Sequence, residues 1–586
     1  MPKDNEMTLP AAISSALRGD AALPLRSIQQ VMDIERLGAM HQSRLSFMRT
    51  LVRRIMRERW QISIDQLNLD VNGYGTVIYK IKTANRIYSF VVFSNYLAPE
   101  DRNDRVIASQ WDLTMALVDG EIDEQYLTQL RNNVPKQEAG RVDSRVFVLS
   151  RANRSARNFD YIVNALASGE QPSIDKIAQV GYLYRTTAVY GSGKLGMADW
   201  EKVSTHFADF NRPFSAEMFV CLMLRNFSLL QVEHIAKNKA PGSYQPMHVA
   251  IKRFIGIGNS TGLGMAPYLI NHPLLINRWV EMRELALARI RVLGGQSTTI
   301  KHKMQLLIER AIEYTAQTVT EDAQQTDNNH KMLLDLQLLS AFVDKDFTGW
   351  NEVISWTEEH CSLQGQEMLV SILLELYPEH VEDLEDFLVV NDTLDIEPLM
   401  SLTQLQQVIE ARYDWALKYD FSQPDTLANF WYRSEEKMEP RLGKTNHEPG
   451  AERQMPLGIA YEVRKCYDLI KAYRADFDEN QRCAHFVQAY PHLRGIVRRI
   501  QGMNNGLYGD IQVNLLDKDV LPMHLLRCKL AFFGVGKFDP KSKLWVRNTM
   551  FQGAPLLEEI GQPFSDDWFL PLAPNLEIPS TVKKEL

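Results

Sequence analysis

The sequence is poor in the features that mark secreted, membrane-spanning or metal-binding proteins. Its 586 residues include only five cysteines, which are scattered and form no Cys-x-x-Cys pair. Isolated cysteines of this kind are typical of reduced, buried thiols in a reducing compartment. No run of about 18 apolar residues, the length that crosses a bilayer, is present. The first 20 residues lack the apolar centre of a signal peptide, so we expect a soluble, cytoplasmic protein with no membrane-spanning segment.

An excess of basic charge is also absent. Acidic residues outnumber basic residues, 73 to 65, and the formal net charge is −8. Proteins that bind the nucleic-acid backbone usually carry a basic face, so this balance disfavours nucleic acid as a partner without excluding a local basic patch. Metal-ligand motifs such as His-Glu-x-x-His are missing as well. The sequence therefore predicts no metal centre, and it leaves the cofactor unknown.

The apolar patterns that are present indicate both helices and strands. Periodicity of three to four residues predicts helix over 27–59 and most of the chain after residue 151, whereas alternation predicts a three-stranded antiparallel meander over 60–94. A parity shift near Asp65 indicates a bulge in the first strand. Residues 528–533 and 544–551 are typical of a late hairpin, and one testable expectation is that it joins the meander in one sheet.

These patterns predict an α+β fold, with a predominantly helical body and a small antiparallel β-sheet. We expect five regions, with a polar linker at 317–330. They are an N-terminal helical segment (1–60), a β-meander region (61–150), a helical region with glycine-rich loops (151–316), a second helical region (331–421) and a mixed C-terminal region with a loose tail (422–586).

Three arginines follow the short strand predicted at 145–149. With Ser150 as the N-cap of a helix, Arg151, Arg154 and Arg157 would lie broadly on one side of it. A helix N-terminus together with guanidinium groups suits a carboxylate or phosphate. The alternative is a helix face whose arginines are solvated or ion-paired.

A lysine surrounded by glycines forms the second candidate, in the segment VYGSGKLGMADW (189–200). Glycines allow a backbone to approach a ligand closely, and Lys194 would meet an anion or form an imine there. The segment nearly matches a nucleotide phosphate loop, but Leu195 replaces the Ser or Thr that would hold magnesium, so we reject that interpretation. The structural alternative is a tight turn between helices.

The richest segment is RFIGIGNSTGLGMAPYLINHP (253–273). It contains G-x-S-x-G, the turn that exposes a nucleophilic serine, here Ser260, between a strand and a helix. Its glycines also loosely resemble a dinucleotide loop. The interpretation that we rank first is simpler: Asn259, Ser260 and Thr261 cradle an anion with their side chains and with backbone N–H groups at a helix start. A glycine-rich helix cap remains the structural alternative.

Two further groups of charged residues are candidates for structural roles. The segment 430–443 contains paired carboxylates, which we interpret as a surface loop with ion pairs rather than an acid–base site. Glu217, Arg225, Glu233 and His234 lie in a very apolar predicted helix, 215–236. Buried polar groups need partners, so these four are interpreted as core ion pairs rather than pocket residues.

The segments GSGKLG, GNSTGLGMAPYLINHP and KFDPKSKLWVRNTMFQGAPL resemble parts of a bacterial protein family to which no activity is assigned. The resemblance covers most of the chain, and it implies no activity, cofactor or catalytic residue.

The leading functional hypothesis is an enzyme of unknown reaction type that binds a small anionic metabolite, bearing a carboxylate or a phosphate, at the glycine-rich loops. One alternative is a serine hydrolase that uses Ser260, and the other is a non-enzymatic helical protein that binds a ligand or partner. Oligomerisation is left open. The hypothesis gives catalytic roles to Lys194 and Ser260 and substrate-binding roles to Arg151, Arg154, Arg157, Asn259 and Thr261.

Overall fold

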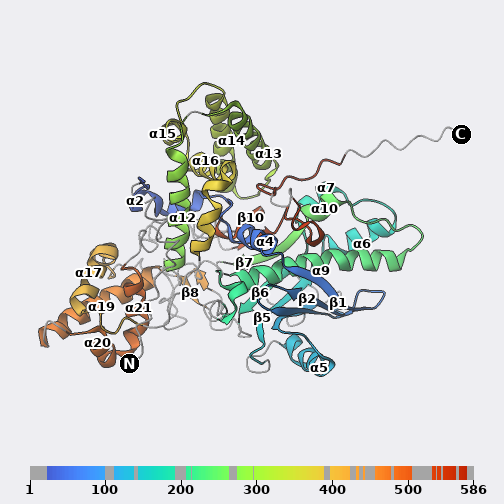
Figure 1. The fold of residues 1–586 in the computed structure, drawn as a ribbon, viewed down its shortest axis with the longest axis horizontal. Coiled ribbons are helices and arrows are strands. Elements are labelled where there is room, and N and C mark those ends of the chain that lie inside the picture. Colours follow the sequence, from blue (N-terminus) through green and yellow to red (C-terminus); the bar gives the residue numbers. More distant parts are fainter. Residues whose placement is uncertain are drawn as a thin grey trace.

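The computed structural model is organised around one nine-stranded sheet, with helices on both of its faces and two groups of helices beside it (Figure 1). The structure describes residues 23–98, 111–136, 143–191, 203, 206–212, 214–262, 273–294, 296–388, 396–422, 431–433, 440–442, 456–476, 481–504, 531–535, 537–542, 545–562 and 567–576.

The strands follow one another in space nearly as they do in the sequence. Their order is β1-β2-β3-β4-β5-β6-β7-β11-β10, and every neighbouring pair is antiparallel except β6 and β7, which are parallel. The strands are β1 (Gln61–Leu69), β2 (Gly75–Lys82), β3 (Ile87–Ser94), β4 (Leu113–Asp119), β5 (Val146–Arg154), β6 (Tyr182–Gly191), β7 (Gly256–Gly262), β10 (Lys537–Ser542) and β11 (Trp545–Met550). A separate two-stranded sheet pairs β8 (Trp431–Arg433) with β9 (Pro440–Leu442).

Helices bury both faces of this sheet. The long helix α9 (Ser215–Lys239) packs along β5, β6 and β7, and α4 (Phe47–Arg57) lies beside it (Figure 1). The other face of the meander carries a smaller apolar cluster under α5 (Glu124–Asn133), including Val91, Leu130 and Leu149. The central strands are buried almost throughout, because helices cover the apolar side chains on both of their faces and exclude water from them.

The remaining helices form connections and two groups. Beside the sheet lie α6 (Phe159–Ala167), α7 (Ile174–Ala178) and α10 (Val249–Phe254), whereas α2 (Ile28–Val31) and α3 (Ile34–Ala39) lie by the first group of helices. The first group is α12 (Pro273–Arg291), α13 (Thr298–Gln317), α14 (Ala323–Val343), α15 (Trp350–His360) and α16 (Leu363–Leu376), followed by the 3-10 helix η6 (Glu382–Leu388). The second is α17 (Leu402–Arg412), α18 (Asp414–Lys418), α19 (Pro456–Asp476), α20 (Cys483–Ala489) and α21 (Arg494–Gly502).

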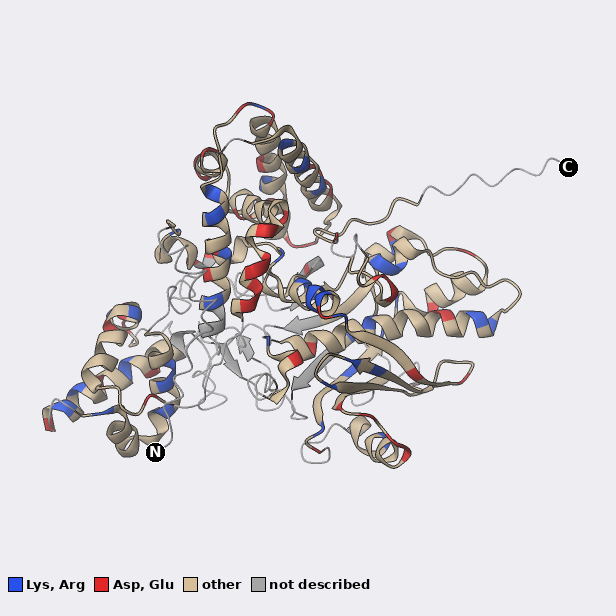
Figure 2. Ribbon diagram, in the orientation of Figure 1, with Lys and Arg blue, Asp and Glu red and all other residues tan. Residues whose placement is uncertain are grey.

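Buried ion pairs attach the N-terminal segment to the first helical group. Acidic residues of η6 lie beside basic residues of α4 (Figure 2), where Arg53 pairs with Glu385. Arg49 of α4 pairs with Glu375 of α16 at 3.0 Å. Charged groups that leave water need such partners, so these pairs fix how residues 23–60 sit on the helices.

The predicted α+β class is confirmed, but the sheet is larger than predicted. The meander and its bulge are as expected, since the β1–β2 register shifts between Ile64 and Gln66. The late hairpin does join the meander's sheet, although its first strand is at 537–542 rather than 528–533. The predicted linker at 317–330 is wrong, because α14 begins at Ala323. Within the described residues, no helix combines the length and the apolar character that crossing a membrane requires.

Candidate functional site

The parallel pair β6–β7 brings the two glycine-rich segments to one edge of the sheet. Thr186 of β6 lies opposite Asn259 of β7, and the strands end at Gly191 and Gly262. Both segments therefore leave neighbouring strands at their carboxyl ends. Lys194 follows the end of β6 by three positions and lies outside the described residues. In open sheets with parallel strands, this is the edge at which ligands usually bind.

The N-terminus of α9 lies at this same edge. Phe219, in the first turns of α9, packs against Trp60 at the start of β1, with ring centroids 5.7 Å apart. At the opposite edge, the Gln231 side chain donates to the Gly73 carbonyl at 2.7 Å and accepts from the Tyr184 hydroxyl at 2.7 Å. Because the start of β1 and the end of β6 share an edge, α9 runs antiparallel to β6 and its positive N-terminal dipole lies near the strand ends.

A row of buried polar side chains crosses four strands beneath α9. Thr186, Asn259 and Asn548 lie opposite one another on β6, β7 and β11, and each is at most 8% exposed. On β5, the Ser150 hydroxyl lies 3.3 Å from that of Thr186. Ile257, two residues before Asn259 on the same face, belongs to the main apolar core. The row is therefore a strip of polar groups inside an apolar layer. Burying polar groups costs free energy unless they are hydrogen-bonded.

Glu217, in the first turn of α9, is the most unusual ionisable group near this edge. Its side chain is buried, and its Oε1 atom has no hydrogen-bond partner among the described residues. Burial raises the pKa of Glu217 to about 7, against the smaller effect of a hydrogen bond with its own backbone. Perturbed carboxyl groups of this kind concentrate at functional sites, so Glu217 becomes a candidate residue.

The predicted arginine helix is wrong, because β5 continues to Arg154. Ser150 is therefore a strand residue and not an N-cap. The Arg151 guanidinium stacks over Trp111 at 4.2 Å, and Arg154 donates to the Tyr184 hydroxyl at 3.0 Å. Arg157 is exposed in the turn that follows. Since β5 ends at the amino edge of β6, the structure does not bring Arg154 and Arg157 to the edge where β6 and β7 end.

The serine turn expected at residue 260 is also absent. Ser260 and Thr261 lie inside β7 and pair with Arg547 and Val546 of β11. A strand at this position lacks the sharp strand-to-helix turn that exposes a nucleophilic serine. Asn259, by contrast, lies in the buried polar row.

Close packing explains two glycines of that segment. A Cβ atom at Gly258 would lie 2.5 Å from the Tyr182 ring, and one at Gly256 would lie 2.3 Å from the Met550 carbonyl oxygen. Neither distance leaves room for a side chain. The absence of side chains at these positions is therefore a packing requirement, which needs no ligand.

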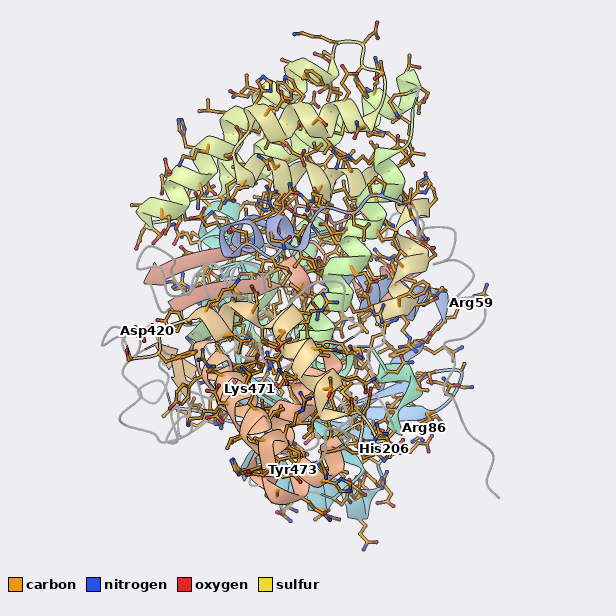
Figure 3. The ribbon with its side chains drawn as sticks, turned by 90° about the vertical axis from the view of Figure 1, so that its left-hand side faces the viewer. Arg59, Arg86, His206, Asp420, Lys471 and Tyr473 are labelled. Carbon is orange, nitrogen blue, oxygen red and sulfur yellow. The ribbon has the colours of Figure 1, made fainter. Side chains whose placement is uncertain are left out.

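An open hollow of about 620 Å³ lies further along the same edge. It is lined by the β2–β3 turn (82–87) and by residues 119–121. Arg86 pairs there with Asp119 at 2.9 Å and donates to the His206 carbonyl at 3.4 Å (Figure 3). The buried Asp209 beneath it accepts hydrogen bonds from Tyr88, Thr83 and Asn85. These groups already satisfy one another, which favours a structural role.

Several site residues were missed by sequence reasoning. Glu217 was interpreted as a core ion pair, yet no cation pairs with it in the described structure. Thr186 and Asn548 were not singled out, because the strand character of 182–191 was overlooked and Asn548 is 289 residues from its neighbour Asn259. The carboxylates of 434–439 lie outside the described residues, and no group of three or more potential metal ligands occurs among the residues that are described.

Comparison with known proteins adds no relative to this picture. No protein-family model matches the chain, and no curated protein or solved structure matches it either.

Proposed function

We propose that the protein is an enzyme that binds a small anionic metabolite at the carboxyl edge of β6 and β7. The observation that carries this proposal is that β6 and β7 run parallel, so that the chain leaves both strands at the edge of the sheet where α9 begins. An anion there gains from the helix dipole and from free backbone N–H groups. The N-cap residue of α9, Phe214, makes no side-chain capping hydrogen bond, so that residue supplies no competing acceptor to the first turn.

The residues are given the following roles. Lys194 supplies the positive charge, because Arg151 and Arg154 are engaged with Trp111 and Tyr184. Asn259 offers an amide from the buried polar row. Ser260 and Thr261 contribute to the strand end from which the second segment leaves.

Thermal stabilisation by small anions tests the proposal. Succinate and inorganic phosphate, each at constant ionic strength, should raise the melting temperature of the wild-type chain by mass action. Lys194→Ala should remove that rise. The matched control is Lys176→Ala. Lys176 lies on α7, which precedes β6 at the opposite edge of the sheet, and its ammonium group lies 4.7 Å from the centroid of the Tyr161 ring. The proposal fails if neither anion stabilises the protein, or if both variants respond as the wild type does.

A further inference from the structure

The strand β1 forms one end of the nine-stranded sheet, and its outer edge has no partner strand in the part of the chain that the structure describes (Figure 1). Its nine residues, Gln61–Leu69, include a single charged side chain, that of Asp65. Two large apolar residues near the middle of the strand are half exposed, Ile64 at 42% and Leu67 at 46%. A long strand edge with unpaired backbone groups and little charge is a template for pairing with another strand.

The bulge in β1 places the apolar residues of both halves of the strand on one face. Ile62 and Ile64 precede the bulge, and Leu67 and Leu69 follow it. Three of the four lie opposite β2 residues of the main apolar core: Ile62 opposite Ile81, Ile64 opposite Tyr79 and Leu67 opposite Val77. Without the extra residue, Ile62 and Leu67 would point to opposite faces, because they are an odd number of positions apart.

The backbone groups of these four apolar residues point to the outer edge of the sheet. The Asp70 amide donates to the Tyr74 carbonyl at 2.8 Å, so it points toward β2. Amide directions alternate along a strand, so the Leu67 amide points away from β2. Side chains of one strand that share a face belong to amides that point to one edge, because all the residues have the same chirality. The amides of Ile62 and Ile64 therefore also lie on the outer edge.

A second copy of β1 in antiparallel orientation matches this edge residue by residue. In the matching register the apolar residues oppose one another: Ile62 lies opposite Leu69 of the second copy, and Ile64 opposite Leu67. The polar residues then pair donor with acceptor: Gln61 with Asp70, Ser63 with Asn68, and Gln66 with Asp65. A two-fold axis repeats each pair, and each apolar pair can exchange two backbone hydrogen bonds. Each carboxylate faces a glutamine amide, so no like charges are opposed.

Other antiparallel registers lose this match. Shifting the second strand by one or two positions puts apolar residues opposite polar ones: Ile62 opposite Asn68 or Asp70, Ile64 opposite Asp65, or Leu67 opposite Gln66. Such pairs are unfavourable, because the polar group loses water without gaining a hydrogen-bond partner. The agreement of side-chain face, amide direction and polarity in one register favours a second copy of this chain over an unrelated strand.

We propose that the protein forms a two-fold symmetric dimer in which the β1 strands of two copies pair antiparallel, so that one continuous sheet runs through both chains. The pairing removes Ile64 and Leu67 from water and gives the outer amides of β1 hydrogen-bond partners. Both copies use the same surface, which makes the interface closed and limits the assembly to two chains.

Analytical ultracentrifugation of the full chain tests the proposal. The wild type should have twice the mass of the 67.3 kDa chain. Ile64→Lys or Leu67→Glu alone puts a charge into the apolar pairs, and each should halve the mass. The double variant puts opposite charges across both of these pairs, so it should be a dimer again. The control is Leu306→Glu on α13, where the side chain is similarly exposed, at 50%, and this variant should remain a dimer.

Hydrogen exchange gives a second readout at the strand itself. Amides of residues 61–69 should exchange more slowly in the wild type and the double variant than in either single variant. A wild type with the mass of one chain overturns self-pairing and leaves the β1 edge to a strand of another protein. A dimer that persists in both single variants, or exchange over residues 61–69 that is equal in all four proteins, overturns the β1 interface. A double variant that stays monomeric overturns the register.

Discussion

Replacing Glu367 with glutamine should be among the most destabilising single substitutions in the chain. Its side chain on α16 is fully buried, and it joins the N-terminal segment to the first helical group. Oε1 accepts from Arg26 at 2.9 Å and from Arg36 at 2.8 Å, while Oε2 lies 2.6 Å from a guanidinium nitrogen of Arg283. Glu284 is the second carboxylate of the cluster and pairs with Arg26 at 2.7 Å.

The magnitude follows from the charges that remain. Glu367→Gln keeps the shape of the side chain but leaves three guanidinium groups facing one carboxylate. Removing one partner of a buried ion pair costs about 3–5 kcal/mol, because an uncompensated charge stays in the interior. That is a large share of a typical unfolding free energy of about 5–15 kcal/mol. Urea unfolding followed by circular dichroism measures the difference.

The pH dependence of this effect has a defined sign. Burial alone would raise the pKa of Glu367, but the guanidinium groups of Arg26, Arg283 and Arg36 outweigh it and hold the pKa well below the ordinary value of 4.5. A carboxyl group whose pKa is depressed by folding stabilises the fold above its unfolded pKa, and that contribution is lost as the pH falls toward the folded pKa. The gap between wild type and variant should therefore be constant from about pH 6 to pH 8 and narrow below about pH 4.5.

The matched control is Glu358→Gln on the neighbouring helix α15. Its carboxylate is partly exposed and lies 3.9 Å from Arg291, so its loss should cost less than about 1 kcal/mol. If Glu367→Gln costs no more than this control, the buried cluster does not stabilise the fold in the way its distances imply.

Two further predictions test the packing of α9 and the state of β7. Arg225→Met should lower the free energy of unfolding by about 3 kcal/mol in the same assay. The reason is that the buried guanidinium group donates hydrogen bonds to backbone carbonyls at 252–255 and 554–555. The surface control Arg310→Met should lower it by less than about 1 kcal/mol. A fluorophosphonate reagent should leave Ser260 unmodified, because that residue lies within a central strand; a mass spectrum with the adduct on Ser260 would restore the hydrolase hypothesis.

The parts of the fold that alternate in polarity were predictable from the sequence, and the parts that are buried on both faces were not. In β1 apolar and polar residues alternate in the sequence, and the parity shift near Asp65 predicted the bulge that the structure has between Ile64 and Gln66. In β5 nearly every residue is buried, so no period of two remains and the segment after Leu149 was interpreted as a helix. The strand β6 was lost for a similar reason, although YLYRTTAVYG is rich in aromatic and β-branched residues.

For the candidate site, sequence reasoning found the segments but not their surroundings. Glycine clusters indicate positions where a side chain would not fit or where the backbone conformation is unusual. The sequence does not tell whether such a glycine approaches a ligand or another residue, and Gly258 approaches the Tyr182 ring. The partnership of Asn259 with Asn548 depends on strand pairing over 289 positions. The isolation of Glu217 depends on which side chains fail to reach it, and no local pattern encodes that.

The single parallel pair of the described sheet accounts for how these features meet. Antiparallel neighbours are joined by short turns, but β6 and β7 point the same way, so the chain between them must cross the sheet, and α9 makes that crossing. The crossing puts the helix N-terminus and both strand ends at one edge. Arg225 then fixes α9 to the start of β7 through the Ile255 carbonyl at 2.7 Å, which sets how far along the strands the first turn of α9 reaches. The contacts that stabilise the crossing therefore also fix the position of the first turn of α9, which carries the buried Glu217, relative to the strands.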